Sequence, residues 1–535
     1  MTDTETDRRA DGIARTALLN CLVREVARPL GEDWLLPASG AVLRLGPGRW
    51  PTGPALLTAE GPVPLELEGL LDVAGRELRA RTGTDNPTLA DEVRDSRDVV
   101  AALLRARAAA RPPADPYLRS EQALLAGHRY HPAPKTRGGG RPEHWLRYAP
   151  EAYAAFPLRL LGVPEELLAG AGDTEAVDRL WGDRAPAGYR VLPAHPWQLE
   201  LLDSWPQLTD GRLLDLGAAA ETAWATSSLR TVYLPEADLS LKFSLEVRVT
   251  NDIRRLWLRD LRWLAPVDEL LAKAFADGPA SASMLADSGY RTADLGGQDA
   301  HEAFAVLVRE GFGPGPRPLL AAGFSEGFPG SPLPGPGSGR ERALEWWRRY
   351  LDQVVPPVLH AYFQHGVVLE CHLQNVLVGV DGEGFPDRVV FRDHEGVKLV
   401  AERHPELLAS LGPDVPTPGV SAGTGWQRLQ YCLLVNHLLE IAGALAEGCP
   451  QAADALWPTA RAAFGGYGGL GGHSGLSGHD GPGGHDGLGG HGGQSELRAL
   501  LDSPTVPAKT NLLLRWLDAD GGDSVYTPLR NPLAG

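Results

Sequence analysis

The sequence predicts an α+β protein of two or three lobes, and three observations carry that prediction. Apolar residues recur at helical spacing near the N-terminus and again after residue 340. Farther along, two pairs of runs rich in β-branched residues each flank a turn signal, as the strands of a hairpin do. The 535 residues, of which 43% are hydrophobic and 22% charged, are typical of a globular chain too long for a single core.

Composition and charge argue against several classes of function. The formal net charge of -17 argues against a nucleic-acid-binding protein, although it is compatible with local basic pockets. The chain does not begin with a basic segment and an apolar core, and no stretch approaches eighteen uninterrupted apolar residues. We therefore expect no membrane contact and a cytoplasmic location. Four cysteines show no paired metal spacing and do not suggest a disulfide scaffold: Cys21, Cys371, Cys432 and Cys449.

The first region, residues 12–110, is predicted to be mainly helical with a short β insert. Apolar residues at helical spacing predict helices over 14–30 and 89–110, and a double proline follows the second. Short extended segments are predicted at 41–45 and 55–57. These stretches contain core and surface residues, and no candidate catalytic or binding residue is evident in them.

A donor-rich loop follows at 127–140, where two His, one Lys and two Arg stand among prolines and glycines. Such a stiff loop is able to meet an anion such as a carboxylate or a phosphate. The alternative is a solvated basic surface loop. Farther along, His195 in a proline-bounded turn at 191–198 either lines a pocket or belongs to a structural turn with a packed Trp, and we favour the turn.

Two consecutive strands are predicted at 230–233 and 241–244, around the turn 235–238. Lys242 lies on the second strand, which is otherwise half-buried. A lysine there either snorkels to solvent or reaches an ATP phosphate, as strand lysines do in kinase-like lobes. In the second case it joins the cationic half of a nucleotide site, together with Ser228, Arg230 and Arg254.

The stretch 365–398 predicts a second hairpin around the turn 381–384. Polar side chains gather at its ends. Antiparallel pairing brings them to one edge, where carboxylates and an amide suit a magnesium ion that holds phosphates. The alternative is a surface hairpin with solvated charges. The polar residues are Glu370, His372, Gln374 and Asn375 before the first strand, and Asp393 and Glu395 after the second.

The rest of the chain predicts connections, helices and one unusual insert. Residues 278–340 are rich in Gly, Pro, Ala and Ser and predict a loop between lobes, followed by helices over 340–363 and 425–446. The segment 507–516 is a basic element able to cap a cleft. The glycine-rich insert 464–494 is either a zinc or nickel chelator or, as its ordering entropy favours, a flexible dispensable loop. Its histidines recur every six residues, at His473, His479, His485 and His491.

A series of polar motifs resembles, in order, those of the siderophore synthetases that act independently of nonribosomal peptide synthetases, the aerobactin-synthetase (IucA/IucC) family. Each motif alone is weak, but the ordered set is specific and runs from about residue 120 to 517. Arg129 stands where the family often has Pro, and the insert 464–494 is not a family feature. The motifs are His128/His131/Lys135, 193–198, 228–231, Lys242 with 250–254, 370–375, 392–396 and 509–515.

The resemblance implies a cupped hand of thumb, fingers and palm, with a kinase-like ATP cleft between fingers and palm. Residues 1–190 then form a mainly helical thumb-like region, 191–335 the fingers with the phosphate-binding strands, and 336–535 the palm with the metal-binding hairpin. The resemblance also implies a homodimer and an ATP-dependent ligase of siderophore biosynthesis. Such a ligase adenylates citrate or a citrate or dicarboxylate derivative, releases pyrophosphate, and joins the acyl group to an amine or alcohol as an amide or ester.

Roles carry over from the family position by position. A trianionic substrate must approach polyanionic ATP, which demands cations around both and a metal between them. The implied ATP-binding set is Ser228, Arg230, Thr231, Lys242 and Arg254. The implied magnesium ligands are Glu370, Asn375, Asp393 and Glu395. The residues implied near the carboxylate substrate are His128, His131, Lys135, Thr250, His372, Gln374 and Lys509. The implied catalytic residues are His131, His372 and Arg254.

Two alternatives compete with this interpretation. Glu370, five residues before Asn375 and followed by Asp393, is similar in arrangement to the aminoglycoside-type phosphotransferases, which are small-molecule kinases. Two observations argue against a kinase. Asp suits the role of the catalytic base better than Glu370 does, and no Gly-rich loop precedes Lys242. A metal-binding protein built around the His repeat leaves the Arg/Lys and Asp/Glu clusters unexplained.

Overall fold

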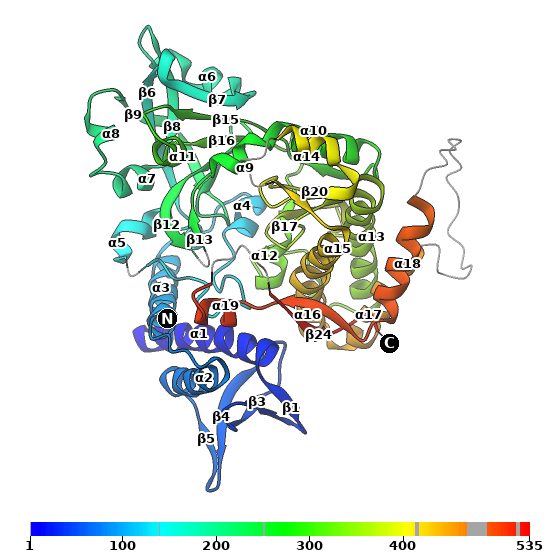
Figure 1. Ribbon diagram of the computed structural model, residues 1–535. Coiled ribbons are helices and arrows are strands. Elements are labelled where there is room, and N and C mark those ends of the chain that lie inside the picture. The colour runs from blue at the N-terminus through cyan, green and yellow to red at the C-terminus, as the bar shows by residue number, and fades with distance from the viewer. Residues whose placement is uncertain are drawn as a thin grey trace.

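The computed structural model combines helices and sheets throughout, which confirms the predicted α+β class (Figure 1). Three large clusters of buried apolar side chains form its core. The structure describes residues 2–138, 140–249, 252–411, 417–467, 489–519 and 525–534.

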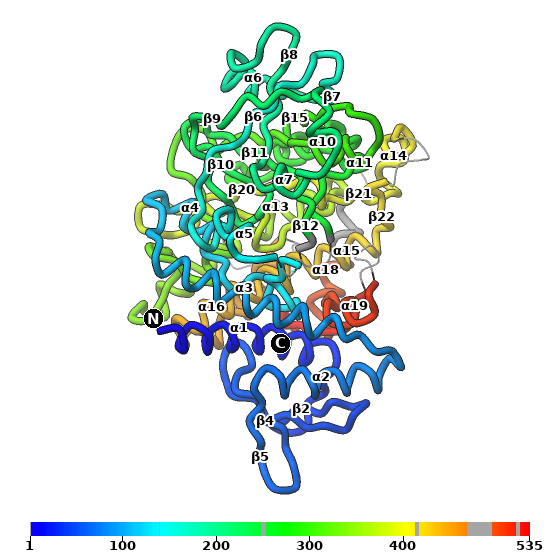
Figure 2. Tube along the Cα trace, turned by 90° about the vertical axis from the view of Figure 1, so that its left-hand side faces the viewer, coloured from blue at the N-terminus to red at the C-terminus, as the bar shows by residue number. Residues whose placement is uncertain are grey.

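The N-terminal region consists of three helices and a small antiparallel sheet at one end of the molecule (Figures 1 and 2). The predicted helix over 14–30 ends at Glu25, because Pro29 and the first strand interrupt it. The helices are α1 (Asp3–Glu25), α2 (Leu67–Thr82) and α3 (Thr88–Ala109). The strands are β1 (Arg28–Leu30), β2 (Asp33–Leu35), β3 (Val42–Gly46), β4 (Thr52–Thr58) and β5 (Gly61–Pro64).

An eight-stranded antiparallel sheet occupies the opposite end (Figure 2). The predicted pair of strands is confirmed in it, with Thr231 opposite Lys242. Its order is β7 (Leu168–Gly172), β15 (Asp287–Ala293), β16 (Val306–Glu310), β11 (Leu239–Phe243), β10 (Thr231–Leu234), β9 (Leu214–Ala225), β6 (Ala155–Pro164) and β8 (Tyr189–Ala194). The strands β6 and β7 lie before the predicted boundary at residue 190, β8 spans it, and the other strands of the sheet follow it. The division into three regions stays a prediction.

The C-terminal region packs helices around a four-stranded sheet. Its predicted hairpin is confirmed, and Asp381 Oδ1 closes the turn by accepting bonds from Glu383 N and Phe385 N, both at 2.9 Å. The sheet order is β14 (Ala282–Met284), β20 (Pro386–Phe391), β19 (Val376–Val380) and β17 (Leu319–Leu320). The long helices are α13 (Arg340–His365), α15 (Ala422–Gln430), α16 (Leu439–Gly448), α17 (Ala453–Tyr467) and α18 (Gly489–Asp502).

One helical stretch, Ala422–Gly448, is long and apolar enough to cross a membrane by length and composition alone. Of the most apolar 18-residue window in this stretch, 72% is buried inside the protein. Its buried side chains belong to the C-terminal apolar cluster, and the stretch contacts α12 (Ala321–Glu326), α17, β18 (Val367–Val368) and β21 (Lys398–Val400). The predicted helix at 425–446 is therefore confirmed as a core element.

The last elements of the chain return to the N-terminal region, where α19 (Leu512–Trp516) packs on α1 (Figures 1 and 2). The Glu25 carboxylate accepts three backbone N–H bonds at the start of α19, at 2.7–2.9 Å. The strands β23 (Thr505–Lys509) and β24 (Tyr526–Arg530) pair beside it. Most of the Gly/His insert lies outside the described residues, so its predicted role as a flexible loop or a metal chelator stays a prediction.

Candidate active site

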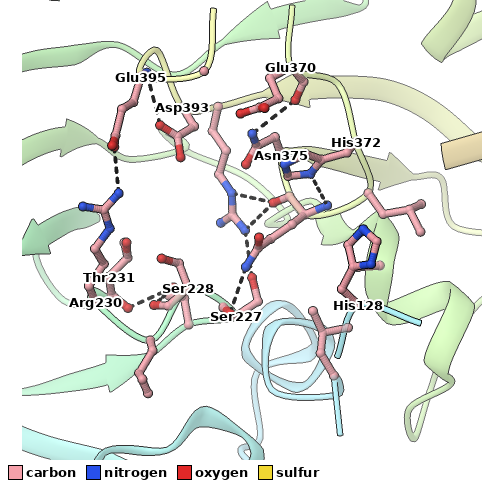
Figure 3. Close-up of a pocket in the computed structure, with 18 of the residues that line it drawn as sticks. His128, Ser227, Ser228, Arg230, Thr231, Glu370, His372, Asn375, Asp393 and Glu395 are labelled. Atoms are coloured by element: carbon pink, nitrogen blue, oxygen red, sulfur yellow. Dashed lines mark hydrogen bonds and ion pairs between the residues drawn. The ribbon is translucent and has the colours of Figure 1, made fainter. Parts of the chain in front are cut away.

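A cleft of about 610 Å³ opens between the eight-stranded sheet, the donor-rich loop and the ends of the hairpin (Figure 3). That volume is typical of a small-molecule site. Arg230 and Glu395 face each other on one side of the cleft, while His128 and His372 stand on the other (Figure 3). The structure therefore brings the predicted cationic segments and the predicted acidic edge to one cavity.

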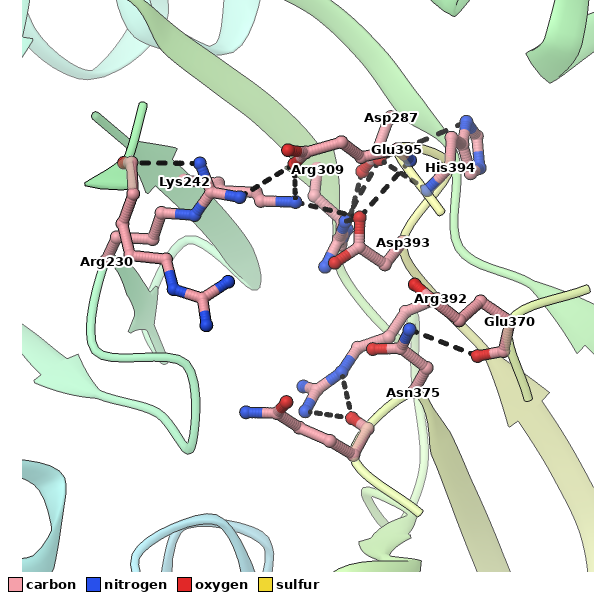
Figure 4. A network of polar contacts seen from close by, with 12 residues as sticks. Arg230, Lys242, Asp287, Arg309, Glu370, Asn375, Arg392, Asp393, His394 and Glu395 are labelled. Carbon is pink, nitrogen blue, oxygen red and sulfur yellow. Dashed lines mark hydrogen bonds and ion pairs between the residues drawn. The ribbon is translucent and has the colours of Figure 1, made fainter. Parts of the chain in front are cut away.

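Lys242 points into this cleft and makes two ion pairs (Figure 4). Its ammonium lies 2.8 Å from Asp393 Oδ1 and 2.6 Å from Glu395 Oε2, and its side chain is 3% exposed. All five residues of β11 are buried, so the lysine cannot snorkel to solvent and its charge needs partners inside. Arg230 Nη2 adds a third pair with Glu395 at 2.8 Å.

Asp393 and Glu395 are held ionised by these cations. Burial alone raises the pKa of the Asp393 carboxyl, but the charges of Lys242 and Arg309 outweigh it and hold that pKa far below its ordinary value. For Glu395, burial is likewise outweighed by Arg230 and Lys242, and the pKa is lowered. Asp393 has φ +79°, a left-handed conformation that Asp and Asn adopt more readily than most residues.

A buried layer behind Asp393 was not predicted from the sequence. Arg309 on β16 makes a two-pronged pair with Asp287 on β15, at 2.5 and 3.0 Å, and lies 3.6 Å from Asp393 (Figure 4). Asp287 Oδ2 also accepts the backbone N–H of His394 at 3.2 Å. The available sequence signal is Arg309 directly after the apolar run 305–308. Pairing with β11 sets Arg309 opposite Ser240, two residues from Lys242 and therefore on the same face of the sheet.

A second buried pair joins three segments and was also missed. Arg392 donates to both carboxylate oxygens of Glu121, at 2.5 and 3.1 Å, and to the Gln374 carbonyl at 2.8 Å. Glu121 ends α4 (Pro116–Glu121) and accepts the backbone N–H of Ser227 at 3.0 Å. Burial acts to raise the pKa of Glu121, but the Arg392 charge and the hydrogen bonds outweigh it and lower that pKa.

Replacing Glu121 with Gln is expected to lower the free energy of unfolding at pH 7 by about 3–5 kcal/mol, because it leaves the Arg392 guanidinium buried and unpaired. A carboxyl whose folded pKa is lowered stabilises the fold above its unfolded pKa of about 4.3 and loses that effect as the pH falls. The difference between Glu121→Gln and wild type should therefore shrink below about pH 4. Denaturant titrations at several pH values measure both effects.

The matched control for that experiment is Glu310→Gln. Glu310 is exposed at the end of β16, so the substitution should change the unfolding midpoint little at any pH. A Glu121→Gln protein as stable as wild type at pH 7 contradicts the assignment of a stabilising buried pair.

Glu370 and Asn375 form the part of the acidic edge nearest α15. Glu370 Oε1 pairs with Arg428 at 2.7 Å, and Asn375 Nδ2 donates to the Glu370 carbonyl at 3.1 Å. Gly396 leaves room for this carboxylate, since a Cβ there would overlap it. Among the described residues no group of three or more His, Cys, Asp and Glu side chains is arranged to hold a metal ion, so the magnesium site stays a prediction.

A smaller cavity of about 180 Å³ adjoins the cleft, and His128 and His372 line both. Burial, and then the neighbouring His131, lowers the pKa of His128 to about 3, so its imidazole is neutral. Burial and Arg428 lower the pKa of Lys509. The other residues that line the smaller cavity are His131, Glu370, Arg428, Tyr431, Cys432, Asn436, Lys509, Asn511 and Tyr526.

The remaining predicted residues fall into four groups. Lys135 lines the cleft, but its ammonium pairs with the buried Glu151. His195 is fully buried among aromatic rings and accepts the Trp197 N–H, so the structural interpretation is right. Thr250 lies outside the described residues. Those that line the cleft as predicted are Ser228, Thr231, Arg254, on β13 (Asp252–Arg254), and Gln374.

Comparison with known proteins agrees with this geometry. Residues 116–325 match the IucA / IucC family. The chain is 27% identical over 460 residues to the L-2,3-diaminopropanoate–citrate ligase of Staphylococcus aureus, covering 78% of this chain and 75% of the relative. It is 30% identical over 371 residues to the rhizobactin siderophore biosynthesis protein RhbC of Rhizobium meliloti, covering 62% and 63%. The structure of ATP-bound aerobactin synthetase IucA from Klebsiella pneumoniae superposes with a TM-score of 0.80 at 21% identity, over 98% of this chain and 100% of that one.

The fold, the cleft and these relatives define an ATP-dependent ligase of siderophore biosynthesis. Residues 116–325 belong to the IucA / IucC family, and the relatives named above agree with the resemblance that the order of the motifs predicted. The relatives are named as a citrate ligase, a siderophore biosynthesis protein and a citryl-hydroxylysine synthase, and none favours the kinase alternative.

A second match covers residues 344–524 and is described as a ferric iron reductase FhuF-like transporter. A reductase needs a redox centre, and an iron–sulfur cluster takes four cysteine thiolates as its usual ligands. Only Cys371, Cys432 and Cys449 fall in the matched range, and all three are buried free thiols. These residues do not supply such a ligand set, so we infer no reductase activity from this match.

Proposed function

We propose that the chain uses ATP to adenylate a carboxylate, citrate or a citrate derivative, with release of pyrophosphate, and then joins the acyl group to an amine. The observation that carries this proposal is the cleft in which Arg230 and Lys242 are paired with Asp393 and Glu395. A polyphosphate needs fixed cations, and a bridging metal needs carboxylates, and here the two sets already face each other.

The ion pairs account for how the site stays stable without ligand. Buried charges are costly unless paired, so the cations and carboxylates neutralise each other while the cleft is empty. When ATP enters, its phosphates take over the cations. The freed carboxylate oxygens then become available as metal ligands. Arg254 and Arg309 line the same cleft and add to its positive charge.

Magnesium fits the oxygen donors at the acidic edge. Mg²⁺ prefers carboxylate, amide and phosphate oxygens and is held by few protein ligands. Asn375 donates through Nδ2 to a backbone carbonyl, which orients its Oδ1 as the remaining acceptor. We propose Glu370, Asn375, Asp393 and Glu395 as the residues that hold the ion. Magnesium bound by these residues would supply positive charge to the phosphates.

We propose that the carboxylate substrate binds where the cleft meets the smaller cavity. His128, His131, His372 and Lys509 converge there, and Gln374 lies beside them in the cleft. The relatives named above include a ligase of citrate with an amine, which supports a citrate-like carboxylate and an amine or alcohol co-substrate. The cupped-hand division into thumb, fingers and palm, a homodimeric state and a cytoplasmic location belong to the same proposal.

The test measures pyrophosphate and ADP separately with ATP, magnesium and citrate, using hydroxylamine as the nucleophile. We expect pyrophosphate and AMP, with release dependent on both carboxylate and metal. ADP without pyrophosphate would overturn the proposal in favour of a kinase. If citrate gives neither product, a panel of citrate monoamides and dicarboxylates follows, and failure of the whole panel also overturns it. A protein with all four repeat histidines replaced should retain full activity.

A further inference from the structure

A fully buried polar chain lies directly behind the residues that line both cavities. The hydroxyl of Tyr350 on α13 lies 2.5 Å from Nε2 of His437, and Nδ1 of His437 lies 2.8 Å from the backbone carbonyl oxygen of Cys371. Tyr350 and His437 are 0% exposed and Cys371 is 1% exposed. None of the three lines either of the two cavities.

The direction of the hydrogen bonds follows from the chemistry of the partners. A carbonyl oxygen only accepts, so Nδ1 of His437 carries the proton and donates to Cys371. The Tyr350 hydroxyl then donates to the lone pair on Nε2. Burial lowers the pKa of His437 to about 4, which agrees with a neutral ring that donates at one nitrogen and accepts at the other.

The carbonyl that this chain holds lies between two residues of the site. Glu370 precedes Cys371 and His372 follows it, and both line the two cavities. Bonds inside the loop run from Asn375 Nδ2 to the Glu370 carbonyl and from Gln374 N to His372 Nδ1. Bonds from outside reach its second half, at the carbonyls of Leu373 and Gln374. The bond from His437 therefore fixes the middle of the loop to the helical core.

The helix that carries His437 is irregular at this point. Residues Tyr431–Leu438 form a π-helical segment between α15 and α16. π-Helical turns insert an extra residue and occur frequently at functional sites. In this segment Asn436 lines both cavities, while the next residue, His437, reaches under the loop.

We propose that His437 and Tyr350 are positioning residues, which set the Cys371 carbonyl and thereby place the Glu370 carboxylate and the His372 imidazole for the reaction. This inference rests on the proposed function. His437 acts through its Nδ1–H, and Tyr350 acts by fixing the tautomer of His437. The two substitutions are therefore expected to differ in severity.

The test compares His437→Leu, His437→Asn and Tyr350→Phe by steady-state pyrophosphate release. We expect His437→Leu to lower kcat at least tenfold and to raise the magnesium concentration for half-maximal rate, because Glu370 loses its placement. The Asn amide retains a donor near the position of Nδ1, so His437→Asn should recover most of the rate. Tyr350→Phe should lower kcat only severalfold, since the ring can still donate to Cys371.

The matched control is His404→Leu. His404 Nε2 also bonds a backbone carbonyl, that of His365 at 2.7 Å, but it lies outside both cavities. It should change thermal stability without changing the magnesium requirement. If His437→Leu lowers only the melting temperature and leaves kcat, KM and the magnesium requirement unchanged, the positioning role is overturned. If that variant does not fold, equal rates for His437→Asn, Tyr350→Phe and wild type overturn it instead.

Amide hydrogen exchange separates this inference from the proposed function. We expect His437→Leu, and to a smaller extent Tyr350→Phe, to speed exchange in a peptide covering 369–376 more than in peptides from α16 and α17, whereas His437→Asn should stay near wild type. This readout needs no turnover. If the wild-type protein has no adenylation activity but His437→Leu and Tyr350→Phe show this local change in exchange, only the proposed function is overturned. If exchange in the loop is the same in these two variants as in wild type, the positioning role is overturned.

Discussion

Replacing Lys242 with Met is expected to lower kcat/KM for pyrophosphate release by about 10²–10³-fold, the cost typical of removing one fixed group that stabilises developing charge. The Lys242 ammonium lies between Asp393 and Glu395 and is shielded from solvent. It comes from a central strand of the eight-stranded sheet, which fixes its position when phosphates and metal occupy the cleft. Met keeps the length and packing of the side chain and removes only the charge.

The same substitution leaves two carboxylates sharing a site with one cation fewer. Like charges in a buried site disfavour each other, so the pKa of Asp393 or Glu395 should rise and the variant should unfold at lower denaturant concentration. Added magnesium should recover part of that stability, since a cation replaces the lost charge. Lys273→Met, on the exposed face of α10 (Leu264–Ala276), is the control. A Lys242→Met enzyme within threefold of wild type would contradict the assigned role.

Local sequence signals predicted the parts of the site that lie on hairpins. The turn residues and β-branched runs located both strand pairs. Side chains alternate between the two faces of a strand, so the sequence alone left Lys242 pointing either to solvent or toward an ATP phosphate. Burial of the entire strand decided between them, and burial depends on β10 and β16 packing on either side, which no local pattern encodes.

The buried partners behind the site could not be predicted in this way. Glu121 and Arg392 are 271 positions apart, and Asp287 and Arg309 belong to strands for which no local chemistry was evident. A charged residue in one sequence does not reveal its partner, because pairing is set by tertiary contacts. Tertiary pairing also bears on the predicted boundary at residue 190, which came from the family resemblance. The strands β6 and β7 precede that residue, yet they lie in one sheet with strands that follow it.

Replacing Asp393 with Asn is expected to lower kcat/KM by about 10²-fold or more and to raise the magnesium concentration for half-maximal rate, because a metal ligand loses its charge. Asn is the informative substitution at this position. Asp393 has φ +79°, which Asn adopts readily, so the backbone of the loop survives and the effect reports on charge alone. An Ala substitution would add backbone strain to the loss of charge and confuse the two.

The control for Asp393→Asn is Asp387→Asn, an exposed residue on β20, which should leave rate and metal requirement unchanged. The expected pattern also distinguishes metal binding from simple electrostatics. Neutralising Asp393 leaves the Lys242 charge less compensated, so phosphate binding by itself should be retained or strengthened. A role for Asp393 as a metal ligand is supported if the rate falls, ATP binds more tightly, and ATP binding depends less on the magnesium concentration than in wild type. If the rate falls while the magnesium requirement stays at the wild-type value, Asp393 is not a ligand and acts only by orienting Lys242.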